Sequence, residues 1–239
     1  MGRAGPARRV KRFWKVVAVE RDGDNWAIRL DGRPVKTPAR ASLVVPTEML
    51  ANAIADEWRS VEETIDPRVM RLSGLANAAV DRVAPDRQSF AQGLARYAEA
   101  DLACYRAEGP RELVDRQEQQ WDKLLAWARR RYDLEFATTC GIVHVAQPQA
   151  TVERLGHAVA ALDAFRLAGL SPLVTIGGSL VAALAVLEGA MTAQEAWQSV
   201  SVDDCWQIEQ WGADPEAKAA LENRRRDFLA GARFLDLLD

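Results

Sequence analysis

The segment Thr192–Gly212 reads TAQEAWQSVSVDDCWQIEQWG and decides how the second half of the chain is expected to fold. Thr192 can accept a hydrogen bond from the backbone N–H of Glu195, and the Glu195 side chain can reach back, which forms a capping box. Gly212 suits the left-handed conformation that commonly closes a helix. The sequence therefore predicts one helix over residues 192–211.

At about 100° per residue, one face of this helix is mostly apolar and carries Ala193, Trp197, Val200, Ile208 and Trp211. Asp204 lies in the middle of that face, where a carboxylate is costly unless it is paired or hydrogen-bonded. Trp206 points the other way, and Asp203 and Glu209 lie on the flanks. Two interpretations follow. The helix is either an interior one whose Asp204 is neutralised by an arginine, or an acidic and aromatic docking surface.

The composition is typical of a globular protein with a sizeable core. Nearly half of the 239 residues are hydrophobic, enough for one large domain or two smaller ones. The net charge of −3 argues against a general nucleic-acid-binding protein, because phosphate neutralisation requires clustered cations. Five cations do lie within the first twelve residues, namely Arg3, Arg8, Arg9, Lys11 and Arg12. We interpret residues 1–11 as a disordered basic arm with no nucleic-acid partner.

The cysteines and the longest uncharged stretch bear on the protein's environment. Three cysteines, widely spaced and without a Cys-x-x-Cys pair, favour a reducing compartment and argue against a zinc site. The uncharged stretch 167–187 approaches the length of a transmembrane helix, but small and polar residues interrupt it. Ser171 and Pro172 are typical of a helix start. The stretch therefore predicts a central bundle helix over 172–188, closed by Gly189, and no membrane insertion.

The beginning of the chain has a β pattern. Four strands are expected, at residues 13–20, 26–30, 33–36 and 42–45, with Asp31-Gly32 as a strong hairpin signal. Such a small sheet needs a covering layer. An amphipathic helix from Thr47, as its N-cap, to about Ser60 provides one.

From Pro85 onward the pattern is helical. Helices are expected at residues 86–104, 110–131, 150–168, 172–188, 192–211 and 215–236, with an irregular stretch or short hairpin at 135–145. The predicted fold class is α+β. A small β-rich N-terminal domain with one helix covers residues 12–82, and a larger all-α helical-bundle domain covers 83–239.

The usual catalytic signatures are missing from the sequence. It has no phosphate-binding loop with its lysine, no Gly-x-Ser-x-Gly elbow and no His-Glu-x-x-His. Cys140 and His144 have a spacing that a thiol nucleophile could use, but a structural cysteine and a surface histidine explain them better. The acids Asp203, Asp204 and Glu209 lie beside tryptophans, and Asp101 and Asp115 could add acids from neighbouring helices. A small-molecule enzyme using carboxylates between helices therefore stays an alternative.

A series of short motifs, in this order and spacing, resembles the F1-ATPase assembly chaperone family known from mitochondria and α-proteobacteria. The motifs span nearly the whole chain: RFWK at 12–15, LDGRPVKTP at 30–38, AIADEW at 53–58, LAN at 75–77, DLACYR at 101–106, WD at 121–122 and WQIEQWG at 206–212. The resemblance implies a small β-rich domain followed by a larger helical one. It implies no catalysis and no nucleotide, metal, cofactor or small-molecule substrate.

The same resemblance implies a partner and a site. The family binds the unassembled α subunit of F1-ATPase, prevents its aggregation and yields it to the β subunit. The family's functional acidic position falls on Asp203, with Asp204 beside it, and its sensitive tryptophan falls on Trp58. The expected partner-binding residues are Asp203, Asp204, Trp206, Glu209, Trp211 and Trp58. The expected location is the cytoplasm in a bacterium and the matrix in mitochondria, and a scaffold protein with another client is the second alternative.

Overall fold

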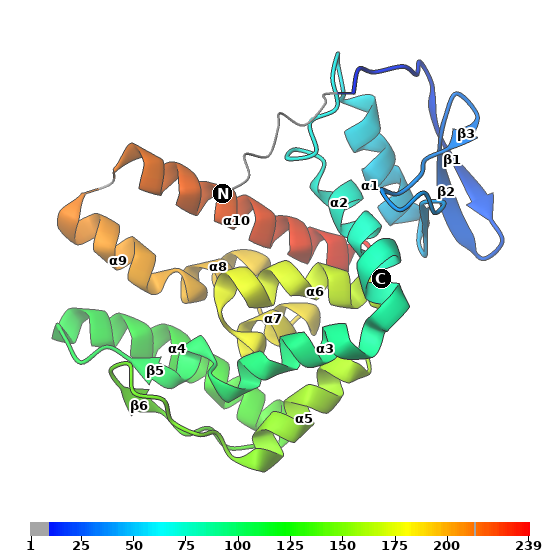
Figure 1. Ribbon diagram of the computed structural model, residues 1–239. Helices are drawn as coiled ribbons and strands as arrows, with labels where there is room; N and C mark the ends of the chain where they lie inside the picture. Colours follow the sequence, from blue (N-terminus) through cyan, green and yellow to red (C-terminus); the bar gives the residue numbers. More distant parts are fainter. Residues whose placement is uncertain (1–9, 213) are drawn as a thin grey trace, which may run out of the picture.

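A four-stranded antiparallel sheet begins the chain, in a computed structural model that describes residues 10–212 and 214–239 (Figure 1). Strand β2 pairs with each of the other three strands; the strands are β1 (Val17–Asp22), β2 (Asn25–Leu30), β3 (Arg33–Pro34) and β4 (Val44–Val45). Asp31 and Gly32 both have positive φ, as the predicted hairpin turn requires. The first strand begins later than expected, because the Asp31 carboxylate accepts the N–H groups of Lys15 and Val16 and keeps them out of the ladder.

Two helices follow the sheet. Helix α1 (Glu48–Arg59) is capped by Thr47, as predicted, and its buried face packs against the sheet. Helix α2 (Arg71–Ala78) is a second helix in a region where only one was expected. Its N-terminus is fixed by Glu57, whose carboxylate accepts the N–H groups of Leu72 and Ser73 at 2.8 Å each. Helical turns over 79–86 then connect α2 directly to α3 (Arg87–Ala95).

The predicted basic arm lies outside the described residues up to position 9. The two remaining arm residues are held by the segment before α2. Val10 O accepts the N–H of Ile65 at 2.9 Å, and Lys11 forms a β-bridge with Thr64.

The rest of the chain is a helical domain, so the α+β class predicted from the sequence is confirmed. Its longer helices are α4 (Arg111–Tyr132), α5 (Gln149–Ala160), α6 (Ala164–Gly177), α7 (Leu180–Leu187), α8 (Ala193–Val200), α9 (Val202–Trp211) and α10 (Pro215–Asp236). Short strands β5 (Tyr105–Arg106) and β6 (Thr139–Cys140) pair in parallel, where an irregular stretch or hairpin was expected. Within the described residues no helix is both long enough and apolar enough to cross a bilayer.

The helix boundaries predicted over residues 86–104, 150–168 and 172–188 were wrong. The helix expected over 150–168 ends at Ala160, and the next one begins at Ala164. Pro172 lies inside α6 instead of starting a helix, because the Asp163 carboxylate caps α6 through the N–H groups of Phe165 and Arg166. Gly178, at φ +68°, then ends α6, and Ser179 caps α7. The helix expected over 86–104 ends at Ala95 and continues as two 3₁₀ turns.

Helix α10 packs closely on α6. A Cβ atom on Gly231 would lie 2.5 Å from Pro172 Cγ and 2.8 Å from Gly169 O, so only a glycine permits this approach. The same helix reaches the N-terminal part of the chain (Figure 1). Arg71 forms a 2.6 Å ion pair with Asp227, and the Thr47 hydroxyl donates to Leu237 O, just beyond the helix.

Candidate docking surface on α9

The predicted helix over 192–211 is two helices, α8 and α9, with the break at Ser201. The capping box of Thr192 and Glu195 is present, as expected. Ser201 leaves helical geometry at φ −106° and ψ 14°, and its hydroxyl donates to Trp197 O at 2.7 Å. Because the backbone changes direction there, the faces of α9 are not a continuation of those of α8.

This break reverses the predicted orientation of the two tryptophans of α9. Trp206, expected to point away from the buried face, is only 6% exposed. Trp211, expected on the buried face, is 78% exposed. The Arg116 guanidinium of α4 lies 4.8 Å from the Trp206 ring centroid and forms a 2.6 Å ion pair with Glu209. Helix α9 is therefore held on α4 by Trp206 and Glu209, and Trp211 is left free.

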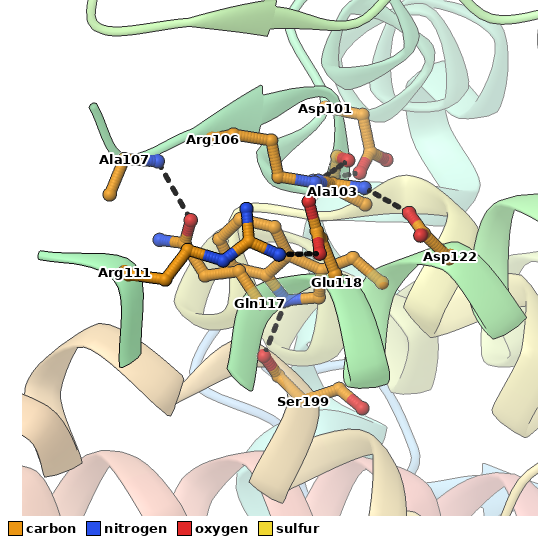
Figure 2. A network of polar contacts seen from close by, with 10 residues as sticks. Asp101, Ala103, Arg106, Ala107, Arg111, Gln117, Glu118, Asp122 and Ser199 are labelled. Carbon is orange, nitrogen blue, oxygen red and sulfur yellow. Dashed lines mark hydrogen bonds and ion pairs between the residues drawn. The ribbon is translucent and has the colours of Figure 1, made fainter. Parts of the chain in front are cut away.

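Asp203 also faces α4, through Gln117. Gln117 is 2% exposed, and its Nε2 donates to Asp203 Oδ1 at 2.7 Å. The Gln117 Oε1 accepts the backbone N–H of Ala107 at 2.7 Å (Figure 2). A chain of hydrogen bonds thus connects α9, α4 and the segment that follows β5.

Asp204 is paired with an arginine, as the first interpretation of the segment expected, but it is not in the interior. Its side chain is 38% exposed, and Oδ2 lies 3.1 Å from Arg224 Nη1 on α10. The inward position predicted for Asp204 was wrong, because the break at Ser201 turns it toward the edge between α9 and α10.

Trp58 does not join these residues. It lies on α1 in the N-terminal part, at the opposite end of the molecule from α9 in Figure 1. Its ring packs edge-on against that of the buried Trp14, with 5.1 Å between centroids. Trp58 therefore belongs to the packing of α1 against the start of the chain.

A groove of about 870 Å³ lies between α9 and the β5–β6 region. Its apolar lining includes Leu102, Tyr105, Pro110, Leu113, Ile142, Trp206 and Trp211, and its polar lining includes Arg106, Glu108, Gln117, Asp203, Gln207 and Gln210. Ile142 is 99% exposed and Val143 beside it is 74% exposed. A large exposed indole and an exposed isoleucine on one groove are the usual mark of a binding surface.

The carboxylates considered for catalysis do not converge. Asp204 pairs with Arg224, Glu209 with Arg116, and Asp115 with Arg111 on its own helix. Asp203 accepts from the Gln117 amide, and Asp101 is fully buried, where its carboxylate accepts the N–H groups of Val181 and Ala103. In residues 10–212 and 214–239, no group of three His, Cys, Asp or Glu side chains could hold a metal ion.

The thiol and imidazole chemistry considered from the sequence also lacks a constellation. His144 is exposed, and its Nδ1 lies 3.2 Å from Tyr105 Oη. Cys140 is exposed on β6. Cys104 is buried, and burial raises the pKa of its thiol to about 12, so this cysteine is not a thiolate at neutral pH.

The sequence analysis missed Gln117, Ile142 and the segment 107–110 as parts of the surface. Gln117 carried a weak signal, as a polar residue one turn before the inward Trp121 on α4. The other wall of the groove had no local signal, because it depends on the parallel pairing of β5 with β6, whose sequences are more than thirty residues apart.

Comparisons with known proteins agree with this fold. A family model described as ATP12 chaperone protein matches residues 11–129. The mitochondrial protein atp12 of Schizosaccharomyces pombe is 24% identical over 242 residues, which cover 96% of this chain and 83% of that protein. The crystal structure of Atp12 from Paracoccus denitrificans has a TM-score of 0.90 and 39% identity, and the match covers 96% of this chain and 98% of that one.

A second solved structure, the Atu1473 protein of Agrobacterium tumefaciens, matches with a TM-score of 0.91 and 36% identity. That match covers 97% of this chain and 87% of that one. The chain therefore belongs to the ATP12 family of F1-ATPase assembly chaperones, the family that its sequence motifs indicated.

Proposed function

We propose that this protein binds the unassembled α subunit of F1-ATPase, prevents its aggregation and yields it to the β subunit without using ATP. Its membership of the ATP12 family supports a role in F1 assembly. The identity of the client as the α subunit comes from the family resemblance of the sequence motifs. The main observation that supports this binding site is the exposed Trp211 on one wall of the groove, with the exposed Ile142 on the opposite wall.

Physical reasoning supports a chaperone that acts by binding. A subunit without its partner exposes apolar surface and strand edges, and such surfaces aggregate. Tryptophan is enriched among the residues that dominate binding energy, because a rigid indole buries a large area at low entropic cost. The amides Gln207 and Gln210 beside Trp211 can pair with backbone groups of a client segment that lies in the groove.

The transfer of α to the β subunit sets an upper limit on the affinity of this protein for α. The β subunit must displace this protein, so the complex needs moderate rather than extreme stability. A groove that mixes apolar and polar side chains fits that requirement better than a large, wholly apolar interface would.

A direct test is to express the α subunit alone, with this protein, and with variants of it, and to measure the soluble fraction of α. Wild type and Met49→Ala should keep α soluble, because Met49 is an exposed apolar residue on α1, away from the groove. Trp211→Ala should lose most of the effect without loss of folded structure. If α aggregates to the same extent with and without wild type, the proposed function is wrong.

The proposal includes the absence of catalysis. The acids that an enzyme would have needed are engaged separately: Asp204 and Glu209 pair with different arginines, Asp203 accepts from the Gln117 amide, and Asp101 is fully buried. A scaffold with another client would make the same groove bind a different protein. In that case pull-down with immobilised wild type from an extract containing α would recover the other protein, and Trp211→Ala would lose it.

The proposed location follows from the proposed client. The protein should be found where F1 subunits assemble, which is the cytoplasm in a bacterium and the matrix in mitochondria.

A further inference from the structure

We infer that Gln117 is a positioning residue for the docking groove, and that Asp203 acts on the client through Gln117 instead of through direct contact of its charge. This inference rests on the proposed function for its effect on the client. The underlying geometry, the chain from Asp203 through Gln117 to Ala107, is independent of any client.

The Gln117 side chain uses both ends of its amide. Its Nε2 donates to Asp203 Oδ1, and its Oε1 accepts the N–H of Ala107, each at 2.7 Å. At 2% exposure the side chain lies at the base of the groove, where its two protein partners take the place of water. A buried donor without a partner costs more than its hydrogen bond contributes, so an amide that loses Asp203 gains by rotating its Nε2 toward another acceptor, and this rotation takes Oε1 away from Ala107.

The surroundings of Gln117 are fixed on both sides (Figure 2). One turn along α4, Trp121 Nε1 donates to Ser199 O on α8 at 2.8 Å. Arg106, next to Ala107, donates to Ala103 O and forms a 2.7 Å ion pair with Asp122 of α4. Because strand β5 and helix α4 are anchored in this way, Gln117 sets the position of the segment that leaves β5.

That segment, residues 107–110, is one wall of the groove, and Asp203 is on the other. Removal of the Asp203 carboxylate would free Gln117 Nε2 inside the protein and release Ala107 with it. The groove would then change shape even though Asp203 itself never contacted the client. A loss of function on Asp203→Ala therefore cannot by itself identify a contact with the client.

An exchange of side chains separates the two roles. In Gln117→Glu, two carboxylates face each other at this site and binding should fall. In the double variant Gln117→Glu with Asp203→Asn, the asparagine amide donates to the glutamate, and the glutamate accepts the N–H of Ala107. Both hydrogen bonds are therefore restored, and the negative charge has moved from position 203 to position 117. We expect the affinity for α to fall at least tenfold in Gln117→Glu and in Gln117→Leu, and to return to within about threefold of wild type in the exchange variant.

Hydrogen exchange of the Ala107 amide gives a readout that needs no client. Its exchange rate should rise about tenfold in Asp203→Ala and in Gln117→Leu and stay near the wild-type rate in the exchange variant. Asp115→Ala removes a paired surface carboxylate from the same helix and should change neither measurement.

The outcomes distinguish this inference from the proposed function. If Ala107 is equally protected in Gln117→Leu and wild type, the positioning role is wrong whatever happens with α. If the exchange variant restores protection of Ala107 but not affinity for α, the charge at position 203 contacts the client directly and the inference fails. If wild type does not bind α at all, the proposed function fails, while the exchange data still decide the role of Gln117.

Discussion

Asp204 and Arg224 connect α9 to α10 through an ion pair with 3.1 Å between Asp204 Oδ2 and Arg224 Nη1. Both side chains are more than one third exposed, so solvent screens the pair. The same arginine reaches toward Ile176 O at the end of α6, at 3.4 Å. Asp204 therefore stabilises the packing of α9 against α10 only weakly.

For Asp204→Ala we expect a loss of at most about 1 kcal/mol in the free energy of unfolding, because exposed ion pairs are worth little. The melting temperature should fall by no more than about 4 °C. Arg224→Ala should behave similarly, and the double variant should lose less than the sum of the two. A fall of about 10 °C or more in Asp204→Ala would instead indicate the interior position that the sequence first suggested.

Trp58→Ala should destabilise the protein rather than specifically weaken client binding. Trp58 is half-buried against Trp14, so truncation should cost about 2–3 kcal/mol of unfolding free energy, measured by chemical denaturation. Its buried indole N–H has no hydrogen-bond partner in the part of the chain that the structure describes. Trp58→Phe should therefore keep most of the stability, whereas equal losses in the two variants would point to a role for the indole nitrogen.

Gly231→Ala should be among the more costly single-methyl additions in this protein. The new Cβ would meet Pro172, Leu173 and the backbone of Gly169 at 2.5–2.8 Å, so α10 must move away from α6. Overpacking of this kind costs about 1–3 kcal/mol. Gly156→Ala on α5 is the matched control, because its nearest neighbour would be 3.9 Å away and alanine is the better helix former. Thermal unfolding should show Gly231→Ala below wild type and Gly156→Ala at or above it.

The buried Asp101 predicts a pH dependence of stability. Burial raises the pKa of its carboxyl above the ordinary value of 3.8, against the opposing effect of the Val181 N–H and other donors. Because the folded pKa is the higher one, the contribution of this group to stability is fully present below 3.8 and is lost as the pH rises through the folded value.

The measurement compares wild type with Asp101→Asn, which cannot ionise at this position. The difference in unfolding free energy, wild type minus variant, should decrease as the pH rises from about 4 toward neutrality. Titrations shared by the two proteins cancel in this difference. A difference that increases over the same range would mean that the hydrogen bonds at the start of α7 outweigh the cost of burial.

Signals that were local in the sequence predicted their elements well. Thr47 and Thr192 cap helices as expected, because each has a side-chain acceptor and an amphipathic segment directly after it. The sequence also contained a signal for a helix break at Ser201, but the apolar periodicity over residues 192–211 favoured a single helix. A serine followed by Asp203 and Asp204 is also a pattern of helix starts, where acids favour the N-terminus.

The shape of the candidate site could not be predicted from the sequence. Asp203 and Trp211 could be named from their motif, but their different surroundings follow from the turn of α9 against α4. Gln117 and Ile142 join them only through contacts between segments remote in sequence; Gln117 gave a weak signal of burial, but no residue pattern indicates the contact that either residue makes.

Helix α10 has a consequence for how this protein is made. It packs on α6 and contacts Arg71 and Thr47, which belong to a part of the chain that is synthesised earlier. A ribosome-bound nascent chain that has not reached residue 215 would leave this face of α6 exposed and would lack the contacts of Arg71 with Asp227 and of Thr47 with Leu237. The nascent protein must therefore keep this apolar surface of α6 from aggregating until α10 has been synthesised.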